Sequence, residues 1–177
     1  MLVVGGSLGA QILNETLPET CGVLSGLAIR HQCGKGNSRG VFEAYRNAGA
    51  DMSNIEVSDF IDDMAAAYAW ADVVIARAGA LTVSELAVSG TPAILIPLPH
   101  AIDDHQTHNA QVLTATGGAV MMTQSDATPE RVADRLEQWI QSPASLLEMA
   151  RRSLGMVAAN ATDEVVTVLK EVAHAND

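Results

Sequence analysis

Val3-Val4-Gly5-Gly6-Ser7-Leu8-Gly9-Ala10 is a short apolar run that breaks into glycines, and helical spacing begins directly after it at Gln11. This order of strand, glycine turn and helix creates an anion site. Glycines let the backbone approach a ligand closely, and the first N–H groups of a helix have no partners inside it. The helix dipole adds partial positive charge at the same point. Ser7 is the first candidate for contacting a diphosphate.

Three other interpretations compete for this stretch. Gly5 to Gly9 fits G-x-S-x-G, the turn that presents a nucleophilic serine in α/β-hydrolases, but such a serine normally follows several strands and almost nothing precedes this one. The dinucleotide fingerprint fails because Ser7 stands where its second glycine belongs. The strand about 20 residues on also offers no carboxylate to hold a ribose, which argues against NAD. A tight turn with a packing serine is the remaining alternative.

Length and net charge limit the classes of function that the chain can have. The chain has 177 residues, 48% of them hydrophobic, which is enough to bury the core of one domain. Ten Lys and Arg against 21 Asp and Glu give a net charge of −11, which argues against a sequence-independent grip on nucleic acid. No apolar run approaches the roughly 20 residues that cross a bilayer, so we expect a cytoplasmic protein. Met1 leads straight into a strand, which suggests a piece of a longer chain.

Strand-like runs alternate with helix-like runs along the whole chain. We expect strands near residues 2–4, 27–33, 55–57, 72–76, 93–96 and 119–122. We expect helices near 11–21, 39–48, 64–70, 81–89, 105–115, 130–140, 143–154 and 163–174. Connections too long for hairpins predict an α/β, Rossmann-like, parallel six-stranded sheet with helices on both faces. Ligands of such sheets bind at the carboxyl ends of the strands.

Four segments at that edge, in this order, resemble the C-terminal half of the MurG family of glycosyltransferases. They are residues 5–10, 60–64, 77–85 and 105–110. The family transfers N-acetylglucosamine (GlcNAc) from UDP-GlcNAc to lipid I, which gives lipid II in peptidoglycan synthesis. The resemblance implies a GT-B fold with an N-terminal acceptor domain absent from this chain, so that residues 1–177 form a single donor-binding domain. It also implies a peripheral enzyme on the cytoplasmic face of the inner membrane, with no cofactor.

The resemblance also implies roles for individual residues. The diphosphate would lie against Ser7 and the glycine loop, and a second helix N-terminus would face phosphate and sugar. The residues concerned are Gly6, Ser7, Gly9, Ala80, Leu81 and Thr82.

The uracil would meet the backbone of Phe60 and Ile61, and Glu85 would accept hydrogen bonds from the ribose hydroxyls. Gln106, with His105, would hold the GlcNAc hydroxyls. The family can place a Gln-Gln pair here, so His105 is a departure from its pattern.

Several of these residues have a plain structural alternative. Glu85 lies three residues after Thr82, the spacing of a capping box. Arg77 is either a buried ion-pair partner or touches phosphate, and we favour the structural role. The group His100, Asp103, Asp104, His105 and His108 has metal-ligand chemistry but is more simply caps and surface. Trp70 and Trp139 lie in apolar helical patterns and are expected in the core.

We therefore expect a UDP-GlcNAc-dependent transferase that is active only as part of a longer chain. The alternatives are a non-catalytic nucleotide-sugar-binding subunit and another GT-B enzyme such as a UDP-GlcNAc 2-epimerase. No general base is assigned to this chain. Breaking the sugar C1–O bond leaves negative charge on UDP, and helix N-termini would stabilise that charge as it develops.

Overall fold

A computed structural model describes residues 1–99 and 104–154 and confirms the six-stranded parallel sheet. The strands are β1 (Leu2–Val4), β2 (Ile29–Gln32), β3 (Ile55–Ser58), β4 (Val74–Ala76), β5 (Ala93–Leu95) and β6 (Ala119–Met121), in the order β3-β2-β1-β4-β5-β6. Val4 pairs in register with Gln32 on one side and Ala76 on the other. The chain therefore reverses its direction of winding between β1 and β4, the position at which doubly wound sheets bind ligands.

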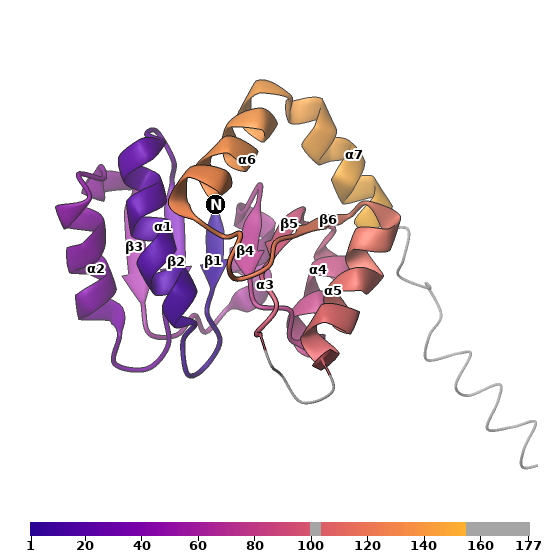
Figure 1. Cartoon of the computed structure of the whole chain (residues 1–177), viewed down its shortest axis with the longest axis horizontal. Helices are drawn as coiled ribbons and strands as arrows, with labels where there is room; N and C mark the ends of the chain where they lie inside the picture. Colours follow the sequence, from indigo (N-terminus) through magenta and orange to yellow (C-terminus); the bar gives the residue numbers. More distant parts are fainter. Residues whose placement is uncertain (100–103, 155–177) are drawn as a thin grey trace, which may run out of the picture.

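The described helices begin within one residue of the predicted positions. They are α1 (Gln11–Val23), α2 (Ser38–Asn47), α3 (Met64–Trp70), α4 (Ala80–Ser89), α5 (His105–Thr116), α6 (Pro129–Gln141) and α7 (Pro143–Leu154). Figure 1 shows α1 and α2 beside β2 and β3 at one side of the molecule, and α4 and α5 beside β5 and β6 at the other. The predicted helix 163–174 lies outside the described residues. None of the described helices is long and apolar enough to cross a membrane.

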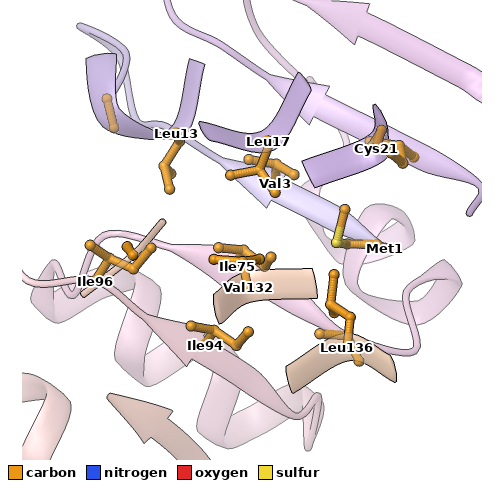
Figure 2. Packing of buried hydrophobic residues seen from close by; sticks show 14 of the residues in the cluster. Met1, Val3, Leu13, Leu17, Cys21, Ile75, Ile94, Ile96, Val132 and Leu136 are labelled. Carbon is orange, nitrogen blue, oxygen red and sulfur yellow. The ribbon is translucent and has the colours of Figure 1, made fainter. Parts of the chain in front are cut away.

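Alternation along the strands divides the core into two layers. Val3 and Ile75 point to one face, where they pack with Leu13 and Leu17 of α1 and with Val132 of α6 (Figure 2). The neighbouring strand residues point to the other face, against α3, α4 and α5. These residues and their partners are Leu2, Val4, Val74, Ala76, Ala67, Val83, Leu86 and Leu113. Helices thus cover both faces, as the continuous apolar strands require.

Two local features differ from the predictions. Trp70 is not a core residue: it is 38% exposed, and the guanidinium of Arg30 lies 4.5 Å from its ring centroid, whereas Trp139 is buried as expected. A 3-10 turn, η1 (Met52–Asn54), precedes β3. The side chain of Asp51 accepts hydrogen bonds from the backbone and hydroxyl of Ser53, which gives this turn its local cap.

Candidate functional site

A cleft of about 690 Å³ opens at the carboxyl edge of the sheet, over the position between β1 and β4. Loops after β1, β4, β5 and β6 contribute its walls. Its lining includes residues 4–12, Arg77, Gly79, Thr82, Leu98, Gln106 and Gln124. Of the predicted site residues, the cleft therefore brings together Gly6, Ser7, Gly9, Arg77, Thr82 and Gln106.

The glycine loop is held by close backbone packing at Gly9. This residue has a φ of +75°, and a Cβ built on it would lie 2.2 Å from the carbonyl oxygen of Cys33. Gly34 (φ +86°) faces it, and a Cβ there would lie 2.2 Å from the Gly9 nitrogen. Neither position can accept a side chain without a backbone shift, so the loop after β1 and the loop after β2 fit together only as glycines.

Helix N-termini at the edge fall into two groups. In the first group a carboxylate caps the helix. The Asp59 carboxylate accepts hydrogen bonds from the Gly36 and Ser38 N–H groups at 2.7 and 3.0 Å at the start of α2, and the Asp63 carboxylate accepts from the Ala66 N–H at 2.9 Å in α3. The hydrogen bonds from Gly36 and Ser38 lower the pKa of Asp59, which keeps its carboxylate charged.

By contrast, the N-cap residues of α1, α4 and α5 are Ala10, Gly79 and Asp104, and none of these three residues caps its helix through a side chain. All three N-termini contribute residues to the cleft. They follow β1, β4 and β5, whereas the two helices with carboxylate caps follow β2 and β3. The edge of the sheet thus has one half in which the N-termini of α1 and α4 lack a carboxylate cap and attract anions, and an acidic half at α2 and α3. Glu15 is the one carboxylate in the described cleft lining.

Arg77 brings the one strong cation of the described cleft lining. Its guanidinium donates to the carbonyls of Ile96 and Pro97 at 3.1 and 3.0 Å and to Oε1 of Gln124 at 2.7 Å. Burial lowers its pKa. No carboxylate among the described residues pairs with it. The buried ion pair that we favoured for Arg77 is therefore not found among the described residues: the half-buried guanidinium ties the loops after β5 and β6 through neutral acceptors, and its charge remains available to an anion.

Glu85 lies outside this cleft, in a groove of about 490 Å³ between α3 and α4. Its Oε2 accepts a hydrogen bond of 2.9 Å from the hydroxyl of Tyr68. The capping-box interpretation is wrong, because α4 begins at Ala80 with Gly79 as N-cap, so Thr82 is inside the helix and cannot cap it. A role for Glu85 toward a ribose stays a prediction.

Five of the remaining predicted residues are not part of the cleft lining: Phe60, Ile61, Ala80, Leu81 and His105. Phe60 and Leu81 are 52% and 73% exposed, and Leu8 in the glycine loop is 91% exposed, so apolar side chains stand open around this edge. Gln106 presents its amide to the cleft, where Oε1 accepts from the Leu98 N–H at 3.0 Å. His105 is exposed at the start of α5.

Three of the five residues of the alternative metal site, Asp104, His105 and His108, lie within the described part of the chain. His100 and Asp103 lie outside the described residues. Within residues 1–99 and 104–154, no group of three or more His, Cys, Asp and Glu side chains is placed to hold a metal ion.

Sequence reasoning missed Gln32, which is buried at the end of β2. Its Oε1 accepts from Gly6 N–H at 2.9 Å, and its Nε2 donates to the carbonyls of Gly6 and Asp59 at 2.9 and 2.8 Å. The available signal was a run of polar residues, Arg30-His31-Gln32, in a strand flanked by two others. A buried polar side chain at a strand end requires partners, and these partners are the loops of the site.

Fold and cleft together define a doubly wound, Rossmann-like α/β domain, with its cleft at the point where the strand order reverses. The chain belongs more particularly to the glycosyltransferase family 28 C-terminal domains, whose family model matches residues 1–165.

Named relatives agree with this assignment. The chain is 47% identical over 170 residues to the UDP-N-acetylglucosamine--N-acetylmuramyl-(pentapeptide) pyrophosphoryl-undecaprenol N-acetylglucosamine transferase of Tolumonas auensis, covering 96% of this chain and 47% of the relative. The enzyme of the same name from Shewanella sp. MR-4 is 47% identical over 171 residues, with 95% and 47% covered. The chain thus spans about half the length of the curated relatives that it matches.

Solved structures give the same picture. MurG of Acinetobacter baumannii matches with a TM-score of 0.83 and 42% identity, over 96% of this chain and 49% of that one. The calicheamicin glycosyltransferase CalG4 matches with a TM-score of 0.66 but only 18% identity, over 97% of this chain and 43% of that one, and this likeness concerns the fold alone.

Proposed function

We propose that this chain binds UDP-GlcNAc as the donor half of a transferase that moves GlcNAc onto lipid I. The observation that carries the proposal is the meeting of the N-termini of α1 and α4, which no side chain of their N-cap residues caps, with Arg77, which has no carboxylate partner among the described residues. Backbone N–H groups and a half-buried guanidinium suit a diphosphate. The names of the relatives, which are GlcNAc transferases, supply the sugar and the acceptor.

The two halves of the edge also support one orientation of the donor. The diphosphate suits the half after β1 and β4, where the N-cap residues of α1 and α4 are Ala10 and Gly79 and carry no carboxylate. The uncharged uracil suits the acidic half, near Phe60 and Ile61, because the carboxylates of Asp59 and Asp63 already occupy the N-termini of α2 and α3. The sugar then extends toward Gln106, with His105 beside it, and Glu85 accepts from the ribose.

In the reaction, the bond between sugar C1 and the diphosphate oxygen breaks, and UDP leaves with an additional negative charge. The N-termini of α1 and α4, together with Arg77, would stabilise this charge without needing to reorganise. We assign the general base and the lipid acceptor to a further region, because the relatives are about twice as long as this chain. The exposed Leu8, Phe60 and Leu81 would be covered when such a region closes over the cleft.

This proposal places the longer protein on the cytoplasmic face of the inner membrane as a peripheral enzyme. The chain by itself is then a nucleotide-sugar-binding domain with no transferase activity, and measurable lipid II formation by the isolated chain would contradict this. Another GT-B activity, such as UDP-GlcNAc 2-epimerisation, is the alternative that assays of the longer protein must separate.

Calorimetric titration of the chain with UDP-GlcNAc, UDP and NAD tests the proposal. We expect saturable binding of both uridine nucleotides and none of NAD. Glu85→Ala should weaken UDP binding about tenfold if its carboxylate holds the ribose, the effect of losing one charged hydrogen bond. Tyr68→Phe is the matched control, because it breaks the same Tyr68–Glu85 bond and keeps the carboxylate. Equal losses in both variants would show that Glu85 acts through α3 and not on the ligand.

A further inference from the structure

We infer that Gln32 is a positioning residue that couples the glycine loop after β1 to the loop after β3. The first loop is the proposed diphosphate subsite and the second is the proposed uracil subsite. The nucleotide part of this inference rests on the proposed function. The coupling itself follows from contacts within the chain.

Strand order places Gln32 between the two loops. As the last residue of β2, it pairs with Val4 on one side and Ser58 on the other, so the chain continues on its two sides into Gly5-Gly6 and into Asp59-Phe60. The side chain is 5% exposed. It therefore lies under both loops at the carboxyl edge, and not in the solvent above them.

Both N–H groups of the Gln32 side-chain amide donate hydrogen bonds, one to each of the two loops. Nε2 donates one hydrogen bond to the Gly6 carbonyl at 2.9 Å and the other to the Asp59 carbonyl at 2.8 Å. Oε1 accepts from the Gly6 N–H at 2.9 Å. Because the amide is planar and both donors come from one nitrogen, a shift of either loop changes the hydrogen bond to the other.

Gln32 is the side chain that ties Gly6 to β2. Within the loop, the Gly6 carbonyl also accepts from the Gly9 N–H at 3.0 Å. The φ of Gly6 is +78°, and a Cβ built on it would meet no atom within 4 Å, so no neighbouring group occupies the space beside it. The reciprocal pair of hydrogen bonds with Gln32 therefore fixes where Gly6 lies relative to the sheet. Asp59, in turn, accepts at its carbonyl from Gly34 N–H at 3.2 Å and caps α2 with its carboxylate, so a movement at Asp59 is transmitted to Gly34, which packs against Gly9.

Amide hydrogen exchange in the ligand-free chain tests the coupling. The reporters are the N–H of Gly6, which donates to Gln32, and the N–H of Gly34, which donates to Asp59. Gln32→Met keeps the length of the side chain and removes its hydrogen bonds. We expect both amides to exchange about tenfold faster, the change that accompanies the loss of roughly one net hydrogen bond. Gln32→Glu keeps the acceptor for Gly6 but loses both donors, so it should accelerate Gly34 more than Gly6.

Thr20→Val is the control for general destabilisation. Thr20 is fully buried in α1 and its hydroxyl donates to the Thr16 carbonyl at 2.9 Å, so this variant also loses a buried hydrogen bond. We expect it to leave Gly6 and Gly34 within about twofold of the wild-type rates. The coupling is overturned if Gln32→Met accelerates Gly6 alone, or if Thr20→Val accelerates both amides equally.

Titration with UDP separates this inference from the proposed function. We expect Gln32→Met to weaken UDP binding about tenfold and Thr20→Val to change it by less than about twofold. If the wild-type chain does not bind UDP, the proposed function fails, while the exchange rates still decide whether Gln32 couples the loops. If UDP binds equally well to wild type and Gln32→Met, Gln32 does not position the nucleotide site.

Discussion

Two glycines of the loop after β1, Gly6 and Gly9, should lose different amounts of folding stability when each is replaced by alanine. Their backbone conformations are alike, but their surroundings differ. Gly6 and Gly9 have φ values of +78° and +75°. An L-residue in this left-handed region costs about 1–2 kcal/mol. A Cβ on Gly6 would meet nothing within 4 Å, so Gly6→Ala should lower the free energy of unfolding by about 1–2 kcal/mol only.

Gly9→Ala adds a steric cost to the same conformational one. Its Cβ would lie 2.2 Å from the Cys33 carbonyl oxygen and 2.8 Å from Nδ2 of Asn37. The Cys33 backbone cannot withdraw freely, since its N–H is bonded to the Ser58 carbonyl at 2.9 Å. Overpacking of this kind costs a further 1–3 kcal/mol, roughly, which brings the expected loss to about 2–5 kcal/mol.

Urea unfolding followed by circular dichroism measures both losses, with the slope of the transition checked for two-state behaviour. Gly9→Ala should also weaken UDP binding more than Gly6→Ala does, because it displaces the start of α1. Equal losses of stability in the two variants would refute the argument. They would mean that the contact between Gly9 and Cys33 does not constrain the loop.

Three further perturbations have expected outcomes. Burial lowers the pKa of His31 to about 4. Below the ordinary histidine pKa of about 6.5, His31 binds a proton in the unfolded chain but not in the folded one. The free energy of unfolding should therefore fall as the pH is lowered from 6.5 toward 4, by about 2 kcal/mol between pH 7 and pH 5. Urea unfolding at these two pH values should show a smaller change in the free energy of unfolding for His31→Leu. Arg77→Met should weaken UDP binding more than Arg77→Lys, which keeps the charge, and titration calorimetry that finds the two equal would limit Arg77 to its loop-tying role. Asp63→Ala should lower the free energy of unfolding by about 1 kcal/mol through loss of the α3 cap, measured against Asp62→Ala as the neighbouring control.

Much of the fold could be predicted, because the periodicity of apolar residues and the residues that begin or end helices indicated the same elements. Thr128-Pro129 predicted the start of α6, and the Thr128 hydroxyl does accept from the Arg131 N–H. Strand ends were predicted less well: β2 was expected over residues 27–33 and spans Ile29–Gln32. The length of β2 depends on how far the neighbouring strands extend beside it, and this cannot be predicted from the local sequence.

Only those parts of the cleft could be predicted that depend on residues close together in the sequence. The glycine motif and the segment from Arg77 to Thr82 indicated two loops at one edge, and the structure brings them together. The partners of Arg77 could not be foreseen, since Gln124 lies 47 residues away in the chain. The same holds for Gln32, whose contacts with Gly6 and Asp59 depend on the strand order β3-β2-β1. Likewise, the start of α4 at Ala80 removed the capping box that spacing alone suggested.

A chain with a net charge of −11 can still hold a dianionic ligand, because the potential in the cleft depends on the groups nearest to it. Charges on exposed side chains are screened beyond about 8 Å at physiological ionic strength, whereas uncapped N–H groups and a half-buried guanidinium act at contact distance. The distribution of caps then becomes informative. Carboxylates occupy the N-termini of α2 and α3, where an anion would be repelled, and are absent from those of α1 and α4. The positions of the caps, and not the net charge, therefore favour a ligand whose negative charge is concentrated between two uncharged groups, as it is in a nucleotide sugar.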